Sequence, residues 1–149
     1  MSKRSILLAM IALATFVLPA CNDGKQKTEG VTGVVTFNGA PLPTATVTFS
    51  PKQGSEGTGA IGTTDDQGVY KLQTVLGKVG AGTTPGSYEV SIKCEKVVDP
   101  GQAPDEDGNG GRDEVVESVI PAKYGKTATS GLTAEVVSGN NTINFDLTE

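Results

Sequence analysis

The sequence predicts an all-β fold, a Greek-key sandwich of about seven short strands. Three observations favour it. Apolar and polar residues alternate with a period of two in several segments. Glycine is abundant, with 20 residues among 149, as in chains with many tight turns, and no stretch after residue 20 keeps a helical period. Strands that are apolar on one side need a second sheet to cover them, and a closed barrel is the alternative architecture.

Extended segments follow one another from Val31 to the C-terminus. The clearest is Thr44–Ser50, in which three apolar residues alternate with threonines and a serine. The longest candidate is Gly86–Val98, whose apolar face includes Tyr88 and Cys94. The other expected strands are Val31–Asn38, Ala60–Thr64, Val69–Thr74, Val115–Ile120, Leu132–Val137 and Thr142–Leu147.

Turn residues separate these segments and predict how they connect. Gly39 and Pro41 predict a turn between paired strands. Asp65 can accept backbone hydrogen bonds within its own turn, and Gly68 tolerates a positive φ there. The last two segments flank Gly139-Asn140-Asn141, which predicts a terminal hairpin.

The first 20 residues predict a signal peptide that ends before Cys21. Lys3 and Arg4 precede an apolar run, and Leu18-Pro19-Ala20-Cys21 resembles the lipobox of bacterial lipoproteins. That resemblance implies a diacylglyceryl group on the sulfur of Cys21, carrying fatty-acyl chains such as palmitate, and cleavage before it. An ordinary secretory signal is the alternative. We therefore expect a signal peptide at 1–20, a polar tether at 21–30 and one domain at 31–149.

The net charge of the chain argues against some classes of binding partner. Residues 1–20 carry 2 of the 12 basic residues and no acidic residue, so the mature chain has 10 basic and 17 acidic residues, a net charge of −7. Nucleic-acid binding needs clustered lysine and arginine, which this balance opposes. The expected membrane contact is through the N-terminal acyl chains, and more than one chain is needed for stable anchoring.

The motifs of residues 31–148 resemble those of carboxypeptidase regulatory-like domains, which are prealbumin-like (transthyretin-like) sandwiches. The first is Gly33-x-Val35-x-x-x-Gly39-x-Pro41-Leu42, continued by Ala45-x-Val47-x-Phe49. Thr64-Asp65-x-x-Gly68-x-Tyr70, Pro85-Gly86-x-Tyr88-x-Val90 and the closing Asn141-Thr142-Ile143-Asn144-Phe145-Asp146-Leu147 follow in the family's order. The resemblance implies a non-catalytic accessory fold. We also expect Tyr88 to return its hydroxyl to a nearby backbone group, as in the tyrosine corner of other sandwiches.

The residue types needed for familiar enzymes are scarce. The chain has no histidine, so a serine or cysteine nucleophile lacks its usual base. Cys94 lies on an apolar strand face, which predicts a buried, unreactive thiol. Turn chemistry accounts for Asp65 and Asp66. The sequence therefore predicts a protein that is not an enzyme.

The acidic segment 99–114 contains the one candidate metal site. Asp105, Asp107, Asn109 and Asp113 follow the spacing of the first part of a calcium loop. The twelfth position is Val116, where such loops carry an acidic ligand, so a solvated acidic loop is preferred and calcium binding would be weak.

These observations together predict a lipid-anchored protein of the cell envelope, facing the periplasm or the exterior. Its role would be binding or structural, with an envelope protein or a glycan as partner, and the loops 51–59, 76–85 and 99–114 are the expected contact surfaces. A weak calcium- or carbohydrate-binding module is the alternative, for which Tyr124 is the best candidate as an exposed aromatic.

Overall fold

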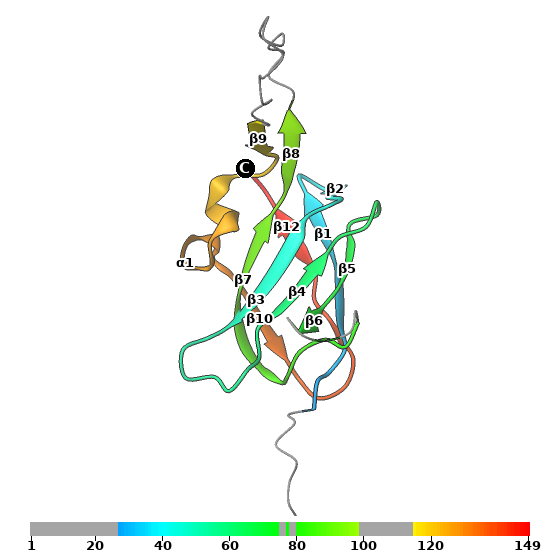
Figure 1. Cartoon of the computed structure of the whole chain (residues 1–149), viewed down its shortest axis with the longest axis vertical. Coiled ribbons are helices and arrows are strands. Elements are labelled where there is room, and N and C mark those ends of the chain that lie inside the picture. The colour runs from blue at the N-terminus through cyan, green and yellow to red at the C-terminus, as the bar shows by residue number, and fades with distance from the viewer. Residues whose placement is uncertain (1–26, 75–76, 78–79, 99–114) are drawn as a thin grey trace, which may run out of the picture.

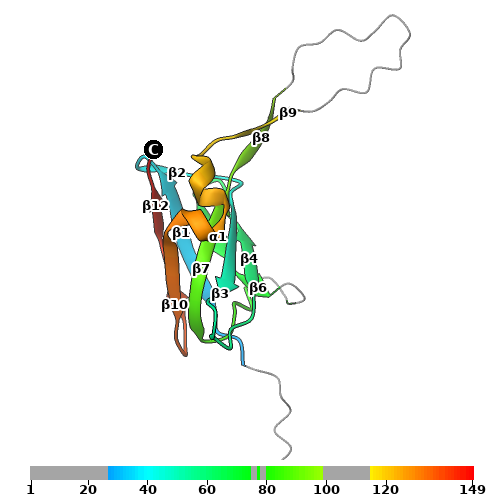
Figure 2. The same cartoon turned by 90° about the vertical axis from the view of Figure 1, so that its left-hand side faces the viewer.

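Two β-sheets face one another in the computed structural model, and a two-stranded ribbon projects from them (Figures 1 and 2). The structure describes residues 27–74, 77, 80–98 and 115–149. Strands dominate this part of the chain, and its helices are two short turns. The predicted all-β sandwich is therefore confirmed.

The first sheet is built around β1 (Val31–Phe37). Along one side of β1 run β11 (Asn141–Thr142) and β12 (Phe145–Leu147), both parallel to it. Along its other side run β5 (Val69–Lys71) and β2 (Ala40–Pro41), both antiparallel. The first and last strands of the domain are thus direct neighbours.

The second sheet is antiparallel, in the order β10-β7-β3-β4-β6. Its central strands are β7 (Gly86–Lys93) and β3 (Thr46–Pro51), which pair from Thr46↔Lys93 to Pro51↔Tyr88. The remaining strands are β10 (Leu132–Val136), β4 (Ala60–Thr63) and β6 (Gln73–Thr74).

The core between the sheets is centred on the ring of Phe49. Its centroid lies 5.7 Å from that of Tyr88 in the same sheet. It lies 6.4 Å from Tyr70 and 6.1 Å from Phe145, which belong to the first sheet. All four side chains are buried, as the predicted alternation requires. This aromatic cluster therefore packs one sheet against the other.

Gly33 allows the last strands to pair with β1. The hydroxyl of Tyr70 donates to the carbonyl of Ile143 at 2.7 Å. A Cβ at Gly33 would lie 1.7 Å from that carbonyl oxygen and 2.9 Å from the Tyr70 ring. The side chain of Asn144 accepts the Val34 N–H at 2.9 Å, which bridges the break between β11 and β12.

The predicted terminal hairpin is wrong, because its two arms lie in different sheets. The arm β10 pairs with β7, whereas β11 and β12 pair with β1. The Asn141 side chain accepts the Val137 N–H at 3.0 Å and donates to the Val137 and Gly139 carbonyls at 2.9 and 3.0 Å. These bonds satisfy backbone groups that would otherwise pair across a hairpin, so the chain can cross to the other sheet.

The predicted turn between paired strands is confirmed at Gly39, where β1 pairs antiparallel with β2, but the chain then crosses to the other sheet, where β3 lies. Thr64 holds this crossing by donating to the Leu42 carbonyl and accepting the Ala45 N–H, each at 2.7 Å. The predicted strand Val69–Thr74 likewise splits, with β5 in the first sheet and β6 in the second.

Two short helical turns follow the ribbon, where the sequence analysis found no helix. They are the 3-10 helix η1 (Ala122–Gly125) and α1 (Thr127–Ser130). The Ser130 hydroxyl donates to the Val90 carbonyl at 2.5 Å and so fixes α1 against β7. A single helical turn is too short to produce a periodic pattern in the sequence.

Substitution of Gly33 by alanine tests the closure of the first sheet. The new methyl group would overlap the Ile143 carbonyl, so β11 and β12 must move away from β1. We expect a loss of at least about 1–3 kcal/mol in the free energy of unfolding, measured by urea denaturation. Gly59→Ala is the matched control, because its nearest atom lies at an ordinary 3.7 Å. Equal stability of the two variants would contradict this packing.

Candidate functional site

The candidate functional features lie at the two opposite ends of the sandwich (Figures 1 and 2). We call the end where residue 27 leads into the first sheet the anchor end. It includes the 137–140 turn, because Gly139 bonds to Glu29 there. The other end is the ribbon end, which carries β8 (Glu95–Val98) and β9 (Val115–Ser118).

Glu29 fixes the chain where it joins the sandwich at the anchor end. Its backbone N–H donates to the Thr83 carbonyl at 2.7 Å, and its own carbonyl accepts the Thr83 N–H at 3.1 Å. Its carboxylate accepts the Gly139 N–H at 3.0 Å and lies 3.2 Å from the Lys27 amine. We call these contacts the Glu29 latch. Glu29 was expected in the tether, but its contacts make it part of the sandwich.

The latch changes the acidity of Glu29. The hydrogen bond from Gly139 is the main cause that lowers its pKa from the usual 4.5, and Lys27 lowers it further. Nothing in the sequence indicated this, because Gly139 follows Glu29 by 110 residues. The carboxylate is therefore ionised at neutral pH and acts as an acceptor in the fold.

Tyr88 is part of a hydroxyl network behind the latch. Its hydroxyl donates to the Thr84 carbonyl at 2.7 Å and lies 3.1 Å from the Thr83 hydroxyl, which in turn donates to the Thr58 carbonyl. The predicted return of the Tyr88 hydroxyl to the backbone is confirmed. The network holds the 83–88 segment in place and so supports the latch.

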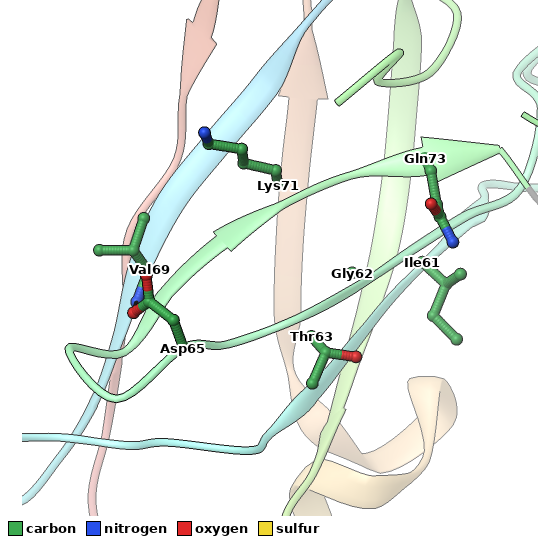
Figure 3. Close-up of a pocket in the computed structure, with 7 residues that line it drawn as sticks. All are labelled: Ile61, Gly62, Thr63, Asp65, Val69, Lys71 and Gln73. Carbon is green, nitrogen blue, oxygen red and sulfur yellow. Dashed lines mark hydrogen bonds between the residues drawn. The ribbon is translucent and has the colours of Figure 1, made fainter. Parts of the chain in front are cut away.

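A shallow groove lies where the edges of the two sheets meet, between β4 and β5 (Figure 3). Its volume is about 470 Å³. Its lining residues are Ile61, Gly62, Thr63, Asp65, Val69, Lys71 and Gln73. Asp65 Oδ1 accepts the Gln67 and Val69 N–H groups, both at 2.9 Å, so its predicted turn role is confirmed. The charged residues that line the groove are Asp65 and Lys71.

The ribbon presents an apolar pair on one face and an ion pair on the other. Val97 and Val116 face each other across the strands and are 63% and 52% exposed. Lys96 Nζ lies 3.8 Å from Glu117 on the opposite face. Within the described residues, β8 and β9 pair only with each other, so each strand has one free edge.

The sequence analysis missed the ribbon because it treated Gly86–Val98 as one strand. The signal was present at Lys96, which breaks the inward series of Tyr88, Val90, Ile92 and Cys94. The core-facing strand therefore ends at Lys93, Cys94 is the last inward residue, and the chain beyond it leaves the sandwich.

Cys94 is buried as predicted, with 4% of its surface exposed. Its thiol donates to the Pro43 carbonyl at 3.5 Å. Burial raises the pKa of the thiol, which disfavours the nucleophilic thiolate.

Tyr124 is not the exposed aromatic that the sequence suggested, and this prediction is wrong. Its ring is 7% exposed within η1, and its hydroxyl donates to the Thr148 carbonyl at 3.0 Å. Lys123 covers the ring at 4.9 Å from its centroid. The 3-10 turn after Pro121 directs the ring onto the C-terminal segment, and a sugar cannot stack on it.

Cys21 and the candidate calcium ligands Asp105, Asp107, Asn109 and Asp113 lie outside the described residues. Their roles stay predictions, and a calorimetric titration with calcium would test the second. Within the part of the chain that the structure describes, no cluster of three or more potential metal ligands occurs. That part also has no helix long and apolar enough to cross a membrane.

Comparisons with known proteins identify no family for this chain. No family model matches it, and no curated protein matches it. The chain is similar in structure to part of a 9R-lipoxygenase from Cyanothece, with a TM-score of 0.41 and 13% sequence identity. The match covers 83% of this chain and 16% of that protein, and a similarity this weak carries no inference about function.

The pH dependence of stability tests the Glu29 latch. Because the folded pKa of Glu29 is lowered, its contribution is complete above about pH 4.5 and is lost as the pH falls through the folded value. We expect Glu29→Gln to lower the melting temperature at pH 7, and the difference from wild type to shrink as the pH falls below 4.5. Glu135→Gln, on the exposed face of β10, is the control and should track wild type. A constant deficit of Glu29→Gln at every pH would contradict the latch.

Proposed function

We propose that this protein is a non-enzymatic, lipid-anchored domain of the cell envelope that holds a protein-binding surface away from the membrane. The observation that carries the proposal is the opposite placement of the chain's N-terminal side and the exposed ribbon (Figure 2). The proposal includes a prealbumin-like sandwich of the carboxypeptidase regulatory-like type, on the sequence motifs given above.

The anchor rests on the lipobox-like Leu18-Pro19-Ala20-Cys21 and on the Glu29 latch. The latch fixes Glu29 to Thr83 and Gly139. A pull on the N-terminus is therefore transmitted to both sheets, since Thr83 precedes β7 and Gly139 precedes β11. Such an attachment suits a domain held by its N-terminal acyl chains on the periplasmic or outer face of a membrane.

The binding role rests on the ribbon end. An exposed apolar pair and two free strand edges are features that extended protein segments recognise. A glycan partner is less favoured, because all three tyrosines, Phe49 and Phe145 are buried, and Phe37 packs partly buried against the core. We therefore propose an envelope protein as the partner.

The proposal that the protein is not an enzyme rests on the residue types it contains and on where they lie. The chain has no histidine. The thiol of Cys94 is buried, and Asp65 is occupied by its turn.

Substitution of Cys21 tests the anchor. In a bacterium that processes lipoproteins, we expect the wild-type chain in the membrane fraction, with a mature N-terminal Cys21 whose mass includes the acyl groups. Cys21→Ser should remain unprocessed or move to the soluble fraction. Cys94→Ser, the matched control at the other cysteine, should stay acylated and membrane-bound. An unmodified wild-type N-terminus would refute the anchor.

A second arm of this experiment tests the contact surface. A photocrosslinking residue replaces Val97 on the ribbon or, as the control, the exposed Thr63 in the groove. We expect a specific protein adduct from position 97 and none from position 63. An adduct at 63 alone would move the binding surface to the groove.

A further inference from the structure

Exposed apolar side chains surround the place where the chain joins the sandwich. Val137 is 56% exposed on the turn that leads to β11, two residues before the latch partner Gly139. Pro85 is exposed two residues after Thr83, the other latch partner. Val137 and Pro85 are neighbours on this surface, because Val136 and Gly86 pair across β10 and β7.

The length of the tether limits what that partner can be. Glu29, where the latch fixes the chain, lies eight residues after Cys21. Fully extended, this segment spans about 26–29 Å, at roughly 3.3–3.6 Å for each residue. Because the latch fixes the chain at Glu29, an acyl group on Cys21 holds the anchor end within this distance of the lipid.

The charge of the anchor end is less negative than that of the mature chain as a whole. The mature chain is strongly acidic, but at this end Glu29 balances Lys27, with which it forms an ion pair, and Glu56 balances Lys52 in the same loop. The Lys52 N–H donates to the Ser87 carbonyl, next to the Gly86↔Val136 pair that ends β7 and β10. This end therefore meets a phospholipid headgroup layer with less repulsion than the acidic average of the chain would give.

The geometry points to the anchor end as a membrane-docking surface. We propose that this end lies against the phospholipid bilayer, with Val137 and Pro85 in the headgroup region. The inference rests on the proposed lipid anchor and adds the face that meets the lipid. Along the strands, Val97 lies eleven residues beyond Gly86, about 36 Å at roughly 3.3 Å for each residue. Docking at the anchor end thus keeps the ribbon clear of the membrane.

Tryptophan fluorescence tests the docking, because the chain has no tryptophan of its own. Val137→Trp and Val97→Trp are made in the full-length acylated protein and reconstituted in vesicles of phosphatidylcholine and phosphatidylglycerol. Both positions are exposed, and thermal melts check that each variant folds. With lipids brominated near the headgroup, we expect at least about twofold quenching and a blue shift for Val137→Trp, with the fluorescence of Val97→Trp unchanged.

Vesicle flotation separates the two proposals. If the acylated protein fails to float with vesicles, the lipid anchor and the docking surface are both overturned. If it floats but Val137→Trp is not quenched, or Val97→Trp is quenched as strongly, only the docking surface is overturned. The double variant Cys21→Ser Val137→Trp should lose the quenching, which shows that the contact depends on the tether.

Discussion

The packing of Phe49 against the opposite sheet is the interaction on which the rest of the structure depends. Its ring meets Tyr70 and Phe145 across the core and Tyr88 within its own sheet. Each such aromatic pair contributes roughly 0.5–1.5 kcal/mol beyond the burial of its surface. This contact lies in the core where the apolar side chains of both sheets are buried.

The aromatic cluster also determines how the chain closes. Tyr70 reaches beneath Gly33 to hold Ile143, and this places β11 and β12 parallel to β1. The turn before β11 then lies beside the segment that leads into β1, where the Gly139 N–H donates to Glu29. Core packing, sheet closure and the fixed N-terminal attachment are therefore successive consequences of one arrangement.

The sequence predicted the properties that depend on local residue order. The alternation in Thr44–Ser50 identified a half-buried strand, and the Asp65 turn, the Tyr88 hydroxyl bond and the buried Cys94 followed from neighbouring residues. It did not predict which strands pair. That choice depends on contacts such as Asn144 with Val34, whose residues are 110 positions apart.

The difference between local residue order and long-range contacts also explains which candidate sites the sequence could predict. The Glu29 latch joins distant segments, so no local pattern indicated it. Tyr124 was the best candidate for an exposed aromatic in the sequence, but a 3-10 turn buries its ring. The ribbon could have been predicted from Lys96, which interrupts the inward series after Cys94.

A double-mutant cycle between Phe49 and Phe145 tests the account most directly. The free energy of unfolding is measured for Phe49→Leu, Phe145→Leu and the double variant. The packing of these rings across the core predicts a coupling energy of about 0.5–1.5 kcal/mol. Changes that add to within about 0.3 kcal/mol would contradict the contact between the two sheets.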